Sequence, residues 1–192
     1  MAYITYITEA IVCGTFNRNS ADRSYMLFTK EAGMLYADAR SVREERSKQR
    51  YALQDFSLVR VSLVKGKGNW KVGSIEVYKN YYLEAVNKEA RGSVVNLFRL
   101  LRRFVGGEEA TPDLFAYTVR ALDEMTGEIE NRPFVLITVQ VQMLLYLGYV
   151  DTKQMPFSIR NIAPHDIKNH RLPAVEKKVG ELYTHAVSMS HL

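Results

Sequence analysis

Histidine and cysteine are the side chains most often used for acid–base, nucleophilic or metal chemistry, and this sequence uses them sparingly. All four histidines lie in the last 28 residues, and none forms an HExxH pair. His165 and His170 stand five apart in a proline-rich stretch, where a metal site is a minor alternative to exposed loop histidines. The one cysteine, Cys13, lies inside a predicted strand, so we interpret it as a buried, inert thiol. An intrachain disulfide and a zinc site built on several thiolates are both excluded.

Motifs that hold nucleotides or build hydrolase sites are also missing. Gly66-Lys67-Gly68 is too short for a phosphate-binding loop, and no helix is predicted after it. The sequence contains no GxSxG and no GxGxxG. Acidic residues between 113 and 130 are spread over a predicted helix and the loop after it, which does not support a catalytic pair. We therefore expect no catalytic residue, no cofactor and no metal, with an enzyme as a residual alternative.

The excess positive charge lies entirely in the first 80 residues, which hold 13 basic and 8 acidic residues. The rest of the chain holds 13 of each. Clustered cations bind phosphates by displacing condensed counterions, so this segment is predicted to bind nucleic acid. The candidate cations, most of them in three predicted loops, are Arg18, Arg23, Arg40, Arg43, Arg46, Lys48, Arg50, Lys65, Lys67 and Lys71. Two alternatives remain: Lys65 and Lys67 could be solubilising, and 40–50 could be a solvated helical face with Glu44 and Glu45 paired four residues on.

Aromatic side chains in the same segment could stack on bases, each worth ~1–3 kcal/mol. The candidates are Phe16, Tyr36, Tyr51 and Trp70, although aromatic residues of a barrel are more often core. Tyr51 is the favoured one, because it lies in a predicted loop where no strand pattern buries it.

The elements that must position these residues change character after Asn80. Short alternating segments at 4–12, 24–29, 34–39, 56–63 and 70–78 predict five strands, typical of a small barrel or sandwich. Apolar residues at helical spacing predict helices over 81–105, 111–125, 134–147 and 174–189, with an irregular stretch over 151–174. No apolar run reaches about 18 residues, and the first nine lack a signal pattern, so we expect a reduced cytosolic protein.

Several segments resemble the RecO family of bacterial recombination mediators. The most specific are TEAIVCG at 8–14 and ADRSYMLFTKEAGML at 21–35, followed by the basic stretch 43–50 and ALQDF at 52–56. Asp113-Leu114-Phe115 and LLYLGY at 144–149 are similar to the helical part of that family. The resemblance covers roughly residues 4–150, about three quarters of the chain.

The resemblance implies an α+β fold, with a five-stranded OB-fold DNA-binding domain over 1–80 and an α-helical domain over 81–192 with an irregular C-terminal tail. It implies binding of single- and double-stranded DNA without sequence preference, annealing of complementary strands, and help to RecR in loading RecA onto DNA coated by single-stranded-DNA-binding protein. No reaction chemistry is implied, and the location would be cytoplasmic, at the bacterial nucleoid. Many members carry a four-cysteine zinc module after L-G-Y, where this chain has Asp151-Thr152-Lys153-Gln154, so we expect no zinc. Asp55 also replaces the usual proline.

A partner groove is a further hypothesis, because helix 134–147 and the stripe around Phe98 and Leu101 are apolar, although an ordinary helical core explains them too. The residues assigned to a partner such as the acidic tail of single-stranded-DNA-binding protein are Phe98, Arg99, Arg102, Arg103 and Arg132. The alternative function is an OB-fold interaction adaptor that has lost DNA binding. An OB domain that prefers RNA is a third reading, which competition between DNA and RNA oligomers would separate.

Overall fold

A computed structural model describes residues 5–19, 22–42, 44, 47, 49–66 and 68–189, with the side chain of Arg50 excepted. The chain forms two compact units. The barrel unit comprises Met1–Glu84 together with Val105–Pro112, and the helical unit comprises Ala85–Phe104 together with Asp113–Leu192. Each unit is described by itself.

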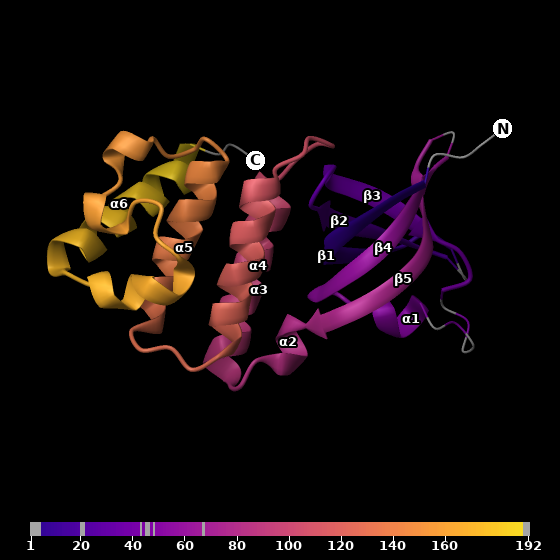
Figure 1. The fold of residues 1–192 in the computed structure, drawn as a ribbon, viewed down its shortest axis with the longest axis horizontal. Coiled ribbons are helices and arrows are strands. Elements are labelled where there is room, and N and C mark those ends of the chain that lie inside the picture. Colours follow the sequence, from indigo (N-terminus) through magenta and orange to yellow (C-terminus); the bar gives the residue numbers. More distant parts are fainter. Residues whose placement is uncertain are drawn as a thin grey trace. The chain divides into compact units, whose positions relative to one another are not determined.

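Five strands close into a barrel in the order β1-β2-β3-β5-β4, with β4 returning to β1 (Figure 1). The strands are β1 Thr5–Asn17, β2 Arg23–Thr29, β3 Gly33–Ala39, β4 Ser57–Lys65 and β5 Trp70–Asn80. All neighbours are antiparallel except β3 and β5, which pair in parallel through Ala37 with Trp70 and Asp38 with Lys71. Two short helices belong to this unit, α1 Gln49–Ala52 and α2 Tyr81–Glu84. A closed five-stranded barrel of this order, followed by helices, confirms the predicted α+β class and OB-like fold.

Alternation along the strands fills the inside of the barrel with apolar side chains. Val12, Tyr25, Leu27 and Leu35 are at most 1% exposed, and they lie in one core cluster with residues of β4 and β5. Successive residues of a strand face opposite sides, so the intervening residues face outward. The first strand is longer than the predicted segment 4–12, because its ladder with β2 continues past an irregularity at Val12 and Gly14 to pair Asn17 with Arg23.

Residues 105–112 lie against the barrel where β3 begins. The Met34 N–H donates to the Gly107 carbonyl at 3.0 Å. Gly33 has a φ of +63°, and a Cβ there would lie 2.8 Å from the Gly107 oxygen. Only glycine combines that backbone conformation with so close an approach. The position therefore keeps this segment attached to the barrel unit.

The helical unit contains α3 Lys88–Phe104, α4 Pro112–Thr126, α5 Arg132–Tyr146 and α6 Pro173–Met189. The predicted continuous helix 81–105 is wrong, because the chain leaves helical geometry between α2 and α3. Asn87 then caps α3, its side-chain oxygen accepting from the Ala90 N–H at 2.8 Å. The predicted central helix is confirmed, since Phe134, Val139 and Met143 of α5 are buried.

The stretch between α5 and α6, predicted to be irregular, forms three short 3-10 helices, η1 Thr152–Gln154, η2 Phe157–Ile159 and η3 Pro164–His170. The buried Gln142 of α5 donates to the Ile159 carbonyl and so anchors this stretch to the helical unit.

Candidate nucleic-acid interface

Asp38, at the end of β3, connects two loops that are far apart in sequence. Arg18, in the loop after β1, forms an ion pair with the Asp38 carboxylate. Asn69, in the loop between β4 and β5, donates its amide to the same Asp38 oxygen at 3.2 Å. Lys71 is the register partner of Asp38 across the parallel β3–β5 pair. Cations predicted on separate loops are therefore gathered at one end of the barrel.

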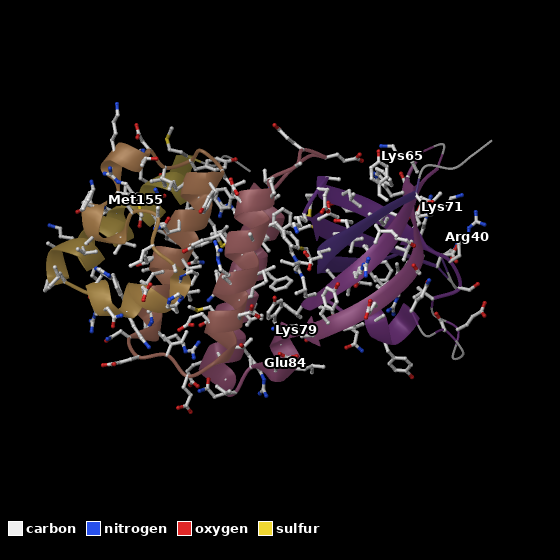
Figure 2. The ribbon with its side chains drawn as sticks, viewed as in Figure 1. Arg40, Lys65, Lys71, Lys79, Glu84 and Met155 are labelled. Carbon is white, nitrogen blue, oxygen red and sulfur yellow. The ribbon has the colours of Figure 1, made fainter. Side chains whose placement is uncertain are left out.

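Asp22 connects the segment that follows β3 to the same end of the barrel. Its carboxylate accepts from the Ser41 N–H at 2.8 Å and from the Asn19 amide at 2.9 Å. The hydrogen bond from Asn19 is the main reason that the pKa of Asp22 is lowered, and the Ser41 N–H adds to it. Asp22 therefore stays ionised and holds the start of the loop that carries Arg40. Figure 2 shows Arg40, Lys65 and Lys71 along the same side of the barrel unit.

The gathered cations differ in how they are neutralised. The Lys65 Nζ lies 3.1 Å from the Glu108 carboxylate and 4.5 Å from the centroid of the Trp70 ring. This lysine is the main reason that the pKa of Glu108 is lowered. Arg18 has Asp38 as its partner, whereas Arg40 and Lys71 are exposed. The phosphates of a DNA strand could contact Arg40 and Lys71 directly. For Arg18 and Lys65 they would compete with the carboxylates of Asp38 and Glu108.

An exposed aromatic pair lies on the outer face of the first three strands. Phe16 of β1 and Tyr36 of β3 are 46% and 49% exposed, and their ring centroids are 6.0 Å apart. Met26 of β2 pairs in register with Tyr36 and so lies on the same face. Tyr36 and Asp38 are two residues apart on β3, so the rings and the joined loops share one surface. This combination of stacking rings beside cations is what binding of unpaired strands requires.

The other two candidate stacking residues have different surroundings. Trp70 is only 7% exposed and meets Tyr6 edge-on at 5.4 Å, which makes it a core residue. Tyr51 is 67% exposed, as its loop position predicted, although it lies in the helix α1.

Tyr51 borders a hollow of about 560 Å³ at the open end of the barrel interior, which we call the barrel mouth. Thr15, Asn17 and Arg23 form one wall. Thr15 pairs with Tyr25 and Asn17 with Arg23, so these residues continue the inward-facing rows of β1 and β2. Tyr51, Leu53, Gln54 and Asp55 complete the lining, and the Asp55 carboxylate accepts from the Thr15 hydroxyl at 2.6 Å. Of the predicted DNA-binding residues, Arg23 and Tyr51 are thus brought together here rather than at Asp38.

Five predicted DNA-binding residues lie wholly or partly outside the described part of the chain. They are Arg43, Arg46, Lys48 and Lys67, together with the side chain of Arg50. Their assignment stays a prediction.

The predicted partner residues of the helical unit do not form one set. Arg99, Arg102 and Arg103 are exposed on α3. Arg99 and Arg103 border a hollow of about 200 Å³ shared with Phe104 and with Tyr183 of α6. The Arg103 guanidinium also donates to the Val187 carbonyl at 3.2 Å, which fixes it beside α6. This hollow combines positive charge with an aromatic wall.

Phe98 and Arg132 have structural surroundings. Phe98 is 1% exposed, so its ring offers no surface to a partner. Arg132 donates to the Met125 carbonyl at 2.9 Å and to the Gly127 carbonyl, where α4 ends. Burial lowers the pKa of Arg132, and nearby glutamates, Glu89 foremost, oppose that shift. Arg132 thus satisfies the last carbonyls of α4 instead of standing free on a rim.

Among the residues that the structure describes, no group of three histidine, cysteine, aspartate or glutamate side chains could hold a metal ion. None of the helices in that part of the chain is both long and apolar enough to cross a membrane.

Sequence reasoning missed the acidic residues that organise this end of the barrel. Asp38 and Asp55 were not singled out for binding, because an acidic residue in a basic segment counts against it. The usable signal was the alternation of β3, which places Tyr36 and Asp38 on one outward face, with Arg40 in the turn that follows.

Comparison with known proteins gives a consistent result. The family model described as "Recombination protein O N terminal" matches residues 1–81, which include all five strands. A DNA repair protein RecO of Myxococcus xanthus (strain DK1622) is 24% identical over 144 residues, covering 74% of this chain and 59% of the relative. A DNA repair protein RecO of Desulfitobacterium hafniense (strain DSM 10664 / DCB-2) is 26% identical over 144 residues, covering 75% of this chain and 52% of the relative. The chain thus spans little more than half the length of these relatives. The barrel thus matches the N-terminal part of the RecO family, and the chain is similar to RecO proteins over about three quarters of its length.

Proposed function

We propose that this chain is a non-catalytic recombination mediator in DNA repair that binds DNA on its barrel unit. The observation that carries the proposal is the joining of three loops through Asp38 and Asp22 beside the exposed Phe16–Tyr36 pair. In this proposal Arg40 and Lys71 contact phosphates while the two rings stack on bases of an unpaired strand. Phosphate contacts and stacking carry little sequence information, so binding is largely independent of sequence.

Similarity to the RecO family supports the wider role. The chain would bind single- and double-stranded DNA, anneal complementary strands, and help RecR load RecA onto DNA coated by single-stranded-DNA-binding protein. Its action would lie in the bacterial cytoplasm, at the nucleoid. These activities belong to the proposal, because the relatives extend well beyond the matched residues.

The acidic tail of single-stranded-DNA-binding protein is the partner that we assign to the hollow between α3 and α6. Arg99 and Arg103 supply positive charge at its border, and Phe104 and Tyr183 supply apolar walls for an aromatic residue. A pull-down with an acidic peptide ending in phenylalanine tests this assignment. Retention by the unaltered chain should be lost in Arg99→Glu and kept in Arg91→Glu, which changes an exposed arginine of the same helix. Equal retention by both variants would contradict the assignment.

Fluorescence anisotropy of labelled single-stranded DNA over a series of salt concentrations tests DNA binding itself. The logarithm of the affinity should fall linearly with the logarithm of the salt concentration, with a slope of about −0.7 per phosphate neutralised. If Arg40 and Lys71 alone engage phosphates, the slope has a magnitude of about 1.4, and further cations raise it. Flat anisotropy at the lowest salt would refute DNA binding by this chain.

A second candidate is an interaction adaptor that has lost DNA binding. The observation in its favour is that Arg18 and Lys65 already have Asp38 and Glu108 as partners. The same titration separates the two functions, because an adaptor gives no salt-dependent binding curve.

A further inference from the structure

Phe157 is the most exposed large apolar side chain in the described part of the chain. It lies on the 3-10 helix η2 and is 89% exposed. Met155 and Ile159, two residues before and after it, are only 2% and 0% exposed. Both neighbours are thus packed into the helical unit while the ring between them is held outward. Aromatic side chains presented in this way are enriched where proteins meet other proteins.

Hydrogen bonds on both sides fix the position of this ring. The Ile159 N–H donates to the Pro156 carbonyl at 3.1 Å, and the Arg160 guanidinium donates to the Met155 carbonyl at 3.0 Å. The Ile159 carbonyl in turn accepts from the buried Gln142 of α5. A segment that is already ordered loses little conformational entropy when a partner covers it, which favours binding.

The stretch that carries Phe157 is basic. Residues 151–178 contain six basic and three acidic residues. Each of the three carboxylates has a partner within the stretch: Asp151 accepts from the Lys153 N–H, Asp166 lies 3.2 Å from His165, and Glu176 lies 2.9 Å from Arg171. Lys153 is exposed four residues before the ring, and Lys168 is exposed on η3, which packs against η2. This surface therefore fits an apolar pocket with acidic residues around it.

The helical unit itself contains a hollow of that kind. Its volume is about 510 Å³, and it lies between the start of α3 and the loop that joins α4 to α5. Ile129 and Pro133 give it apolar walls. Three exposed glutamates border it, namely Glu89, Glu128 and Glu130. Arg132 supplies one positive charge there, so the border stays negative overall.

Asn131 fixes the loop that forms this hollow. Its φ of +54° is a left-handed conformation, which asparagine adopts more readily than most residues. The side-chain oxygen accepts from Arg171 at 2.6 Å, and the backbone carbonyl accepts from the Phe134 N–H at 3.0 Å. The hollow is thus formed before anything binds in it, as is usual for binding sites.

One chain does not fill its own hollow with Phe157. The hollow includes Arg132, at the start of α5, whereas the stretch of Phe157 is attached to Gln142. At 1.5 Å per residue, these two positions are about 15 Å apart along the helix axis. Figure 1 shows that the chain enters and leaves α5 at opposite ends of this helix. A second copy, in contrast, can bring its ring to the hollow without any rearrangement.

We propose that copies of this chain associate head to tail, with Phe157 of one copy between Ile129 and Pro133 of the next. Lys153 and Lys168 then face the glutamates of the hollow. The two sides of this contact are different surfaces, so further copies can add in a row. The contact does not require DNA. Where copies lie side by side on one DNA strand, their high effective concentration makes even a weak contact sufficient.

Analytical ultracentrifugation of the full chain tests the proposal without DNA. The average mass should rise with protein concentration and fall again when salt is added, because salt screens the charges across the contact. Phe157→Ala should weaken the association at least about 30-fold, the loss expected when a central anchor is truncated. Met189→Ala is the matched control. It removes another apolar side chain of the same unit, 61% exposed, and should leave the association unchanged.

Two variants that each fail alone should associate when they are mixed. Glu128→Lys combined with Glu130→Lys reverses the charge around the hollow and leaves Phe157 in place. Phe157→Ala leaves the hollow intact. All three positions are exposed, so these changes spare the core. The mixture should form pairs but no longer rows, because only one intact ring meets one intact hollow. Restored association would show that the two altered surfaces face each other.

A photoreactive p-benzoylphenylalanine at position 157 keeps an aromatic ring there and identifies its neighbour. Irradiation should link it to residues 128–133 of a second copy, as located by mass spectrometry of proteolytic fragments. The same group at position 189 should not reach these residues. Links from position 157 to another surface would overturn the assignment of the hollow.

The remaining outcomes are equally decisive. The proposal is wrong if the mass stays that of one chain up to about 1 mM, or if Phe157→Ala associates as well as the unaltered chain. If Phe157→Ala instead weakens binding of single-stranded DNA while the mass never changes, the ring stacks on bases and the assignment to a second copy is overturned. A failure of DNA binding leaves this contact untouched, so the two failures are distinguishable.

Discussion

Replacing Tyr36 by alanine tests whether the outer face of β3 stacks on bases. The ring is 49% exposed and lies 6.0 Å from the ring of Phe16, so its removal takes away half of an exposed pair and little of the core. Stacking on one base is worth ~1–3 kcal/mol, which corresponds to about 5- to 150-fold in affinity for single-stranded DNA. The slope of affinity against salt should not change, because no charge is removed.

The assay is the anisotropy titration of single-stranded DNA over several salt concentrations, with Tyr78→Ala as the matched control. Tyr78 lies on β5 and is 45% exposed, so the control removes a comparable ring elsewhere on the same barrel. Tyr36→Phe should restore affinity, because stacking needs the ring and not the hydroxyl. The reasoning is refuted if Tyr36→Ala stays within twofold of the unaltered chain, or if Tyr78→Ala weakens binding equally.

Three further changes probe the charges of the molecule. Asp38→Asn releases Arg18 for phosphate, so the salt slope should steepen by about 0.7 and affinity at low salt should rise; an unchanged slope would show that Arg18 does not reach DNA. Because Lys65 lowers the pKa of Glu108, their interaction stabilises the fold at neutral pH and is lost as the pH falls through that lowered pKa. The difference in melting temperature between the unaltered chain and Glu108→Gln should therefore shrink below pH about 4, and a difference that persists there would contradict this origin. Arg132→Met leaves the last carbonyls of α4 without their donors and should lower the free energy of unfolding in urea by about 1.5–3 kcal/mol, with DNA affinity unchanged.

The strands were predictable because their residues alternate, and alternation is a local property. The end of β1 was not, because Thr15 to Asn17 are polar and match a turn, while their extended conformation comes from pairing with the start of β2. The break between α2 and α3 had a local signal that was overlooked. Asn87 followed two residues later by Glu89 is a reasonable start for a helix, but the apolar residues on both sides suggested one continuous helix.

The candidate site was predictable in composition but not in arrangement. The basic and aromatic residues of the site could be identified in the sequence. Which of them lie close together in space depends on how the barrel closes. The contact between Asn69 and Asp38 spans 31 residues, and no local pattern announces such a pairing. Arg132 shows the opposite error, since it was assigned as a cation for an acidic partner, while its guanidinium donates to carbonyls where α4 ends.

Net charge overstates the positive surface that this barrel can offer to phosphate. Arg18, Lys30 and Lys65 each have a carboxylate partner in the folded chain, so part of the excess seen in the first 80 residues is neutralised internally. The pairs of Lys30 and Lys65 are exposed on both sides, and such pairs contribute little to stability. Their larger consequence is for binding, because DNA phosphates must either displace these carboxylates or leave the pairs intact. A slope near 1.4 would mean that the pairs persist and that stacking supplies much of the affinity, whereas a clearly steeper slope would mean that the DNA strand breaks them or engages further cations. Asp38→Asn separates these two sources, because it removes one pair and leaves every cation in place.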